Sequence, residues 1–134
     1  MSRAKPAAAV STVSPVISIP RSKLGHAEVV LAAKAAGRCE FRGCNEYLYE
    51  HPLTGEAGNF AENAHIVAFR EGGPRGQENR PQQINGVDNL MLLCRRDHKL
   101  IDDNPGRYTR EELKEHKREH EARIRQVIGL GLLM

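Results

Sequence analysis

Three cysteines and an aspartate have the spacing of a metal-binding set. Cys39 and Cys44 lie in a short glycine-containing segment, and Cys94 follows fifty residues after the second of them. Structural zinc takes four ligands in a tetrahedron, commonly from short-spaced pairs on separate elements. Asp97 or His98 would complete the second pair with Cys94, because residues three or four apart share one helix face. The pattern predicts a zinc site, and the alternative is a set of ordinary buried cysteines.

Two histidines and an asparagine form a second candidate set. We expect His65 in a strand, Asn89 at the start of the next strand, and His98 on the helix that follows. Taken singly, each is typical of a hydrogen-bonded core residue. Their order along the chain, together with the cysteines, predicts that strand, long loop, strand and helix bring all three to one small surface.

Cations flank this second set along the chain. Residues 70–87 contain six glycines and prolines and predict a long loop, a feature that is usually functional in compact domains. Cations beside a candidate site suit a DNA backbone, whose phosphates they would neutralise. The alternative is a solvated face interleaved with acidic residues. The candidate phosphate-binding side chains are Arg70, Arg75 and Arg80 in the loop, and Arg95, Arg96 and Lys99 on the helix of His98.

Hydrophobic spacing and capping signals predict the elements that must position these residues. Apolar residues recur at helical spacing before Gly37, and Thr109 and Glu112 form a capping box at the start of a charged amphipathic helix. Residues 1–20 are rich in Ala, Ser, Val and Pro and predict a flexible or extended arm. The predicted elements are a helix at 23–36, a short strand at 46–50, a strand towards the end of 60–69 around Ile66, Val67 and Phe69, a buried strand at 89–93, and helices at 94–102 and 109–127.

Composition limits the class of protein. The chain has 134 residues, of which 40% are hydrophobic and 4% aromatic, and this indicates one small domain with an aliphatic core. Its net charge of +3 is compatible with a polyanionic partner without requiring one. Its apolar runs fall short of the roughly 18 residues of a membrane span, and its N-terminus does not read as a signal peptide. An odd, low cysteine count favours metal chemistry in a reducing cytoplasm over disulfides.

The ordered pattern resembles HNH nucleases of the ββα-metal class, from about Ala36 to Asn104. The letters H, N and H of that name fall on His65, Asn89 and His98. More narrowly, the stretch resembles the HNH domain of cyclic-oligonucleotide-activated anti-phage (CBASS) effectors that carry a SAVED sensor domain. The motifs that carry the resemblance are Cys39-x4-Cys44, Ala64-His65-Ile66, Glu71-Gly-Gly-Pro-Arg75, Asp88-Asn89-Leu90, Leu93-Cys94-x-x-Asp97-His98, His98-x-Leu100-Ile101-Asp102, Tyr108-Thr109 and Lys117-x-x-His120-Glu121.

The resemblance implies an α+β fold, in which a zinc-stapled ββα-metal (HNH) core is flanked by an N-terminal helix and a C-terminal amphipathic helix. Residues 21–134 would form this nuclease domain, and a cyclic-nucleotide-sensing domain would follow it in a longer chain. The resemblance also implies a metal-dependent endonuclease that cuts double-stranded DNA with little sequence specificity and acts in anti-phage defence. A homodimer is expected, because one site per chain cuts one strand.

The resemblance also implies a role for each site residue. His65 would be the general base that takes a proton from water, and a neutral imidazole near pH 7 suits that task. His98 would bind the catalytic ion, Mg2+ or Mn2+, while Asn89 would either bind the ion or orient His65 through its amide. The zinc ion would be structural, because it would join the segment of the first two cysteines to the helix of His98.

Two residues depart from the family pattern. Asp97 stands where many HNH domains have a cysteine or histidine, and Ala64 stands where many have an acidic metal ligand. Glu62 could substitute for the latter, because residues two apart share one face of a strand. Two alternatives to the enzyme therefore stay open. One is a catalytically inactive, zinc-stapled nucleic-acid-binding module, and the other is an interaction domain whose histidines are core residues.

Overall fold

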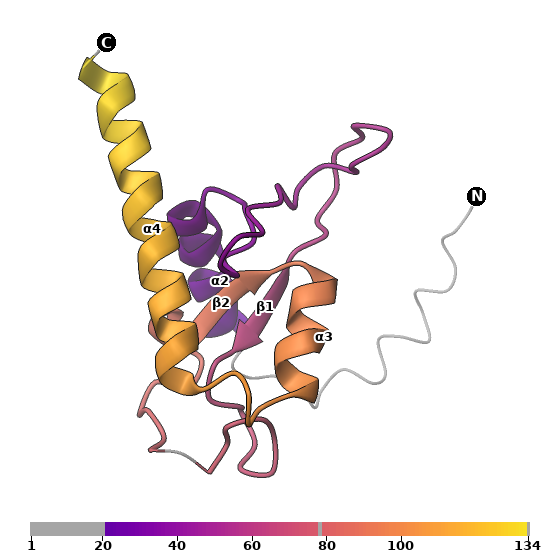
Figure 1. Cartoon of the computed structure of the whole chain (residues 1–134), viewed down its shortest axis with the longest axis vertical. Coiled ribbons are helices and arrows are strands. Elements are labelled where there is room, and N and C mark those ends of the chain that lie inside the picture. The colour runs from indigo at the N-terminus through magenta and orange to yellow at the C-terminus, as the bar shows by residue number, and fades with distance from the viewer. Residues whose placement is uncertain (1–20, 78, 134) are drawn as a thin grey trace.

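A computed structural model describes residues 21–77 and 79–133 of the chain (Figure 1). The predicted arm at residues 1–20 lies outside the described residues. Helices combined with a two-stranded sheet fit the predicted α+β class. In chain order the elements are α2 (Arg21–Ala35), β1 (Glu62–His65), the 3-10 helix η2 (Val87–Asn89), β2 (Leu90–Leu93), α3 (Arg95–Asp103) and α4 (Arg110–Leu133).

The sheet consists of two four-residue strands in antiparallel register. Glu62 lies opposite Leu93 at one end, and His65 lies opposite Leu90 at the other. All four residues of β2 are buried, because α3 packs on both strands and α2 packs on β2. The prediction of a buried strand at 89–93 is confirmed, apart from its first residue. The predicted strand at 46–50 was wrong, since only single bridges form there, at Tyr47 and Glu50.

β1 ends earlier than its sequence suggests. Ile66 and Val67 favour a strand, but the last residue of β1 is His65. The Ile66 N–H still donates to the Asn89 carbonyl at 2.8 Å. Beyond it, the Val67 N–H and carbonyl both bond the side-chain amide of Asn89 instead of a neighbouring strand. The predicted strand towards the end of 60–69 is therefore confirmed at His65 and wrong at Ile66, Val67 and Phe69, because a side chain replaces the ladder beyond Ile66.

The predicted helices are confirmed, with small changes at their ends. The capping box at the start of α4 is present, since Thr109 Oγ1 accepts the Glu112 N–H at 3.2 Å. α4 continues past the predicted end at residue 127, and in Figure 1 its C-terminal part extends beyond the sheet and α3. None of the helices in the described part of the chain is both long and apolar enough to cross a membrane.

A buried ionic cluster fixes the segment of the first two cysteines against β2 and α4. The Glu40 N–H donates to the Leu92 carbonyl at 2.8 Å, and Glu40 Oε1 accepts the Leu92 N–H at 3.0 Å. Lys117 Nζ on α4 lies 3.8 Å from Glu40 Oε1 and 2.7 Å from Glu121 Oε2. Burial and a hydrogen bond with Glu121 raise the pKa of Glu40 to about 9. The segment is thereby held by polar contacts as well as by the apolar core.

α4 also closes the C-terminal end of α2. His120 on α4 is 2% exposed, and its Nε2 lies 3.0 Å from the carbonyl oxygen of Ala35. A carbonyl only accepts hydrogen bonds, so Nε2 carries the hydrogen. Burial lowers the pKa of His120, which favours the neutral form of the ring in the folded chain. The chain then turns through Ala36 and Gly37, whose φ angles are 56° and 70°.

We expect acid to destabilise the fold in part through His120. Because burial lowers the pKa of His120, the unfolded chain binds an extra proton below about pH 6.5, and the free energy of unfolding falls as the pH falls from there. Urea titrations between about pH 7.5 and 5.5 should give a shallower pH slope for His120→Gln than for the wild type. His26 is exposed, so His26→Gln is the matched control. Equal slopes for His120→Gln and the wild type would contradict this account.

Candidate functional site

Cys39, Cys44, Cys94 and Asp97 form one group, called here the cysteine cluster, whose four ligand atoms lie within 4.8 Å of one another. Cys39 Sγ lies 3.3 Å from Asp97 Oδ2 and accepts the Cys94 N–H at 3.3 Å. Cys94 is the N-cap of α3, where its Sγ accepts the Asp97 N–H at 3.3 Å. The other candidate for the fourth ligand, His98, bonds carboxylates outside this cluster. The structure thus brings together the predicted set with Asp97 as its fourth member.

The chemistry of the cysteine cluster fits a metal ion. Burial raises the pKa of the Cys39 thiol, and burial also raises the pKa of Cys94 to about 11. The two thiols therefore hold their protons at neutral pH unless a cation displaces them, as metal binding to cysteine does. Three sulfur atoms and one carboxylate oxygen form a donor set that a soft or borderline divalent ion accepts. This group could hold a metal ion.

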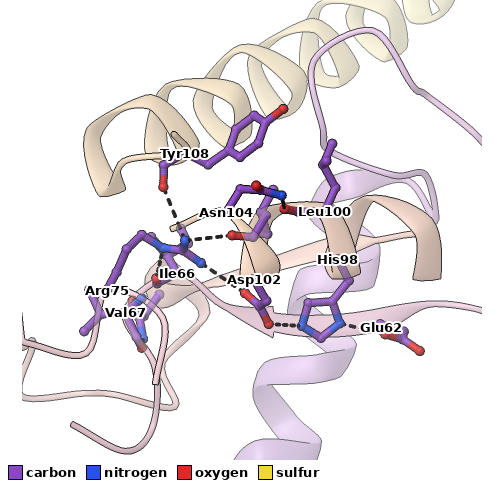
Figure 2. Close-up of polar contacts among 11 residues, drawn as sticks. Glu62, Ile66, Val67, Arg75, His98, Leu100, Asp102, Asn104 and Tyr108 are labelled. Atoms are coloured by element: carbon purple, nitrogen blue, oxygen red, sulfur yellow. Dashed lines mark hydrogen bonds and ion pairs between the residues drawn. The ribbon is translucent and has the colours of Figure 1, made fainter. Parts of the chain in front are cut away.

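His98 lies between two carboxylates, in a group of Glu62, His98 and Asp102 that we call the His98 cluster (Figure 2). His98 Nδ1 is 2.6 Å from Glu62 Oε1, and His98 Nε2 is 3.0 Å from Asp102 Oδ2. The hydrogen bond with Asp102, followed by that with Glu62, raises the pKa of His98. The hydrogen bond with His98 in turn lowers the pKa of Glu62. The three side chains line a surface cleft of about 340 Å³, so an imidazole and two carboxylates face solvent together.

Sequence reasoning identified two members of the His98 cluster and missed the third. Glu62, expected only as a substitute ligand, does lie beside His98. Asp102 belongs to one of the sequence motifs, but the motif alone predicts no role for its side chain. Its signal was the spacing of four residues from His98, which places both side chains on one face of α3.

His65 occupies the opposite end of β1 from Glu62, three residues and roughly 10 Å along the strand. Its Nε2 lies 2.8 Å from Asn85 Oδ1. Its ring also contacts Phe69, with ring centroids 6.1 Å apart. Among the residues that the structure describes, no hydrogen bond joins His65 to the His98 cluster. Asn85 carried no signal in the sequence beyond its place in a long loop.

Asn89 does not act as the sequence led us to expect. It is 3% exposed, and its Oδ1 accepts the Val67 N–H at 3.0 Å. Its Nδ2 donates to the carbonyls of Val67 and Ile84, both at 2.9 Å. Both amide atoms are therefore engaged with the backbone, and neither contacts His65. The expectation that Asn89 binds the catalytic ion or orients His65 through its amide is corrected in one respect, because the amide contacts the backbone on either side and not the His65 ring.

Arg75 requires a second correction, because its guanidinium is buried and not available to phosphate. Its side chain is 1% exposed, and Nε donates to the Ile66 carbonyl at 2.6 Å (Figure 2). Nη1 donates to the carbonyls of Ile101 and Tyr108, both at 3.2 Å. Nη2 lies 3.2 Å from Asp102 Oδ1. One side chain thus joins the backbone beside His65, the C-terminal end of α3, the approach to α4 and the His98 cluster.

Of the remaining predicted cations, Arg80 is half-buried and the other four are exposed, and three of the five form polar contacts within the chain. Arg95 Nε lies 3.5 Å from Glu62 Oε2, and Lys99 Nζ lies 2.8 Å from Asp103 Oδ2. Arg80 donates to the carbonyls of three loop residues, Ala68, Phe69 and Gly76, and so braces the loop. Despite these ion pairs, Arg95 and Lys99 are exposed and line the cleft of the His98 cluster. Arg96 is exposed on the same helix, and Arg70 is exposed in the loop.

Comparison with known families identifies the segment that carries both clusters. Residues 39–104 match a family model described as HNH endonuclease. The match begins at Cys39 and ends at Asn104, so it contains both clusters and also His65, Asn89 and Arg75. It supports membership of the HNH family. No curated protein matches the chain.

We expect Arg75 to be a large contributor to stability. Arg75→Lys should lower the free energy of unfolding by about 2–4 kcal/mol, because an ammonium cannot serve four acceptors arranged around a planar fork. Urea denaturation at neutral pH measures the change. Arg70→Lys, at an exposed position of the same loop, is the matched control and should change stability by less than about 0.5 kcal/mol. Equal effects of the two substitutions would show that the buried contacts contribute little.

Proposed function

Starting from the HNH match across both clusters, we propose that the chain is a metal-dependent endonuclease that hydrolyses phosphodiester bonds in double-stranded DNA. The observation that carries this proposal is the assembly of Glu62, His98 and Asp102 on one cleft within the matched segment. The exposed cations Arg95 and Lys99 on α3 line the same cleft and are candidate phosphate contacts. Within residues 21–77 and 79–133, no element presents an identifiable set of base-reading side chains, and we propose little sequence preference.

In the proposed mechanism, His65 accepts a proton from the water that attacks phosphorus. Glu62 and His98, with Asp102 beside them, are the residues that would hold Mg2+ or Mn2+. When bound there, such an ion would neutralise charge on a phosphate oxygen and on the leaving oxygen. Binding requires His98 to release a proton, because a ring nitrogen must be free to coordinate. Arg96 and Lys99 would contact flanking phosphates and orient the strand.

The cysteine cluster has a structural role in this proposal. Zinc at Cys39, Cys44, Cys94 and Asp97 would join the segment around Cys39 to the first turn of α3. His98 lies one residue beyond Asp97, so the ion would fix the start of the helix that presents His98. This arrangement supports Zn2+ as the structural ion and a lighter divalent ion as the catalytic one.

The narrower resemblance to CBASS effectors supports a role in anti-phage defence, with a cyclic-nucleotide-sensing domain that follows residue 134 in a longer chain. Two copies would be needed to cut both strands, so we propose a homodimer in the active state. One observation favours a second candidate, a zinc-stapled nucleic-acid-binding module without catalysis. Ala64, which is 1% exposed, offers no ligand where many HNH domains have an acidic residue.

We expect His65→Ala to abolish metal-dependent nicking of supercoiled plasmid, with a loss of about 10²- to 10⁴-fold in rate, because the general base is removed. Mg2+ and Mn2+ are tested in parallel. His26→Ala, at an exposed histidine of α2, is the control and should retain full activity. DNA binding without cleavage, by a zinc-loaded wild type that has also been forced to dimerise, would favour the inactive binding module.

We expect about one zinc per chain by elemental analysis, and we expect a chelator to lower the melting temperature. Cys39→Ser and Asp97→Asn should reduce the zinc content and the melting temperature together, because each removes a ligand. Asp103→Asn, at an exposed acid on the same helix, should change neither. Full zinc content in Asp97→Asn would remove this aspartate from the ligand set.

A further inference from the structure

We infer that Asn85 is a positioning residue that holds His65 in a single tautomer, with the hydrogen on Nε2 and the lone pair on Nδ1. This inference deepens the proposed function and rests on it for its catalytic meaning. Asn85 lies outside the three residues that give the HNH pattern its name. The inference follows from one side-chain contact and from the way the backbone around it is fixed.

The contact itself specifies where the hydrogen lies. His65 Nε2 is 2.8 Å from Asn85 Oδ1, a normal length for a hydrogen bond. An amide oxygen accepts and cannot donate, so Nε2 must be the donor. The neutral ring then has its free lone pair on Nδ1, which is the atom able to take a proton from water. An imidazole in the opposite tautomer would present a hydrogen to that water and could not act as its base.

The positions of the two partners are tied to a common residue. Asn89 Nδ2 donates to the carbonyl of Ile84, the residue directly before Asn85. The Asn89 N–H donates to the carbonyl of Gly86, the residue directly after it, at 2.9 Å. On the other side, Asn89 holds the backbone of Val67, two residues after His65. The loop that carries Asn85 and the strand end that carries His65 are therefore set against each other by one buried amide.

The ring of His65 is also restricted on a second side. Phe69 lies against it with ring centroids 6.1 Å apart and planes inclined at 56°. Phe69 is 52% exposed, so this contact limits rotation of the ring without removing it from solvent. Asn85 supplies the directional hydrogen bond, and the Phe69 ring supplies an apolar surface against which the imidazole packs. Together they leave Nδ1 as the ring nitrogen that can meet a substrate water.

The first test reads the tautomer directly and does not require activity. In the wild type at about pH 8, the ¹⁵N NMR shifts of the His65 ring should show a protonated Nε2 and an unprotonated Nδ1. In Asn85→Ala the two shifts should move towards each other, because the tautomers then interconvert. Asn85→Asp should keep the wild-type pattern, since a carboxylate oxygen also accepts from Nε2. His65→Gln assigns the signals, and Gln82→Ala, at an exposed amide of the same loop, is the matched control.

The second test reads the consequence for plasmid cleavage. Asn85→Ala should lower the rate constant about 10- to 100-fold, part of what a general base contributes. Asn85→Asp should retain cleavage but move the pH of half-maximal rate upwards by about one unit, because a carboxylate stabilises the imidazolium. Gln82→Ala should have the same rate constant and the same pH of half-maximal rate as the wild type.

The two tests separate the failure of this inference from the failure of the proposed function. Unchanged ring shifts in Asn85→Ala, whose folding is checked by its melting temperature, would overturn the positioning role whatever the activity. A zinc-loaded, dimerised wild type that shows the expected ring shifts but leaves plasmid intact would overturn the proposed endonuclease and keep the tautomer assignment.

Discussion

The buried guanidinium of Arg75 is the interaction on which the geometry of the whole site depends. It holds the carbonyl of Ile66, next to His65, and also the carboxylate of Asp102, which contacts His98. A buried cation is tolerated only when its partners are complete, so a shift of either partner would leave charge unpaired. Arg75 also has a left-handed φ of 56°, a conformation that costs on the order of 1 kcal/mol or more outside glycine. The four hydrogen bonds of the guanidinium offset this cost. They also fix the distance between the strand end that carries His65 and the His98 cluster.

α3 is anchored at both ends, and His98 lies between the anchors. A nine-residue helix is marginal on its own, so contacts outside the helix must define its position. Its first turn meets Cys39 through Cys94 and Asp97, and its last turn meets Arg75 through Ile101 and Asp102. The two strands offer only four residues each, which is too little to fix a helix by packing alone. The contacts of Cys39 and of the Arg75 guanidinium thus fix the position of α3, which a larger sheet would otherwise fix by packing.

Local signals in the sequence predicted most of the fold, because helix periodicity, capping and hydrophobic runs act over neighbouring residues. The cysteine cluster was also predictable, since Cys94 and Asp97 lie within one helical turn. Arg75 was not, because an arginine in a loop rich in glycine and proline has the pattern of a solvated side chain. Its acceptors lie 9 to 33 residues away in the chain and are mostly backbone carbonyls, which carry no signature of residue type.

The two asparagines near His65 show why a motif position does not identify a contact. Asn89 must accept from the Val67 N–H and donate to two carbonyls, and among small side chains only an amide does both. An aspartate of the same shape would place a carboxylate oxygen against two carbonyl oxygens. Its residue type is therefore required by the backbone, whatever chemistry takes place nearby. Asn85 uses only its oxygen in its contact with His65, so the demand there is for an acceptor at one point in space. The sequence alone does not distinguish the roles of these two asparagines. Only the folded backbone shows that Asn89 supports the end of the strand and that Asn85 contacts the imidazole of His65.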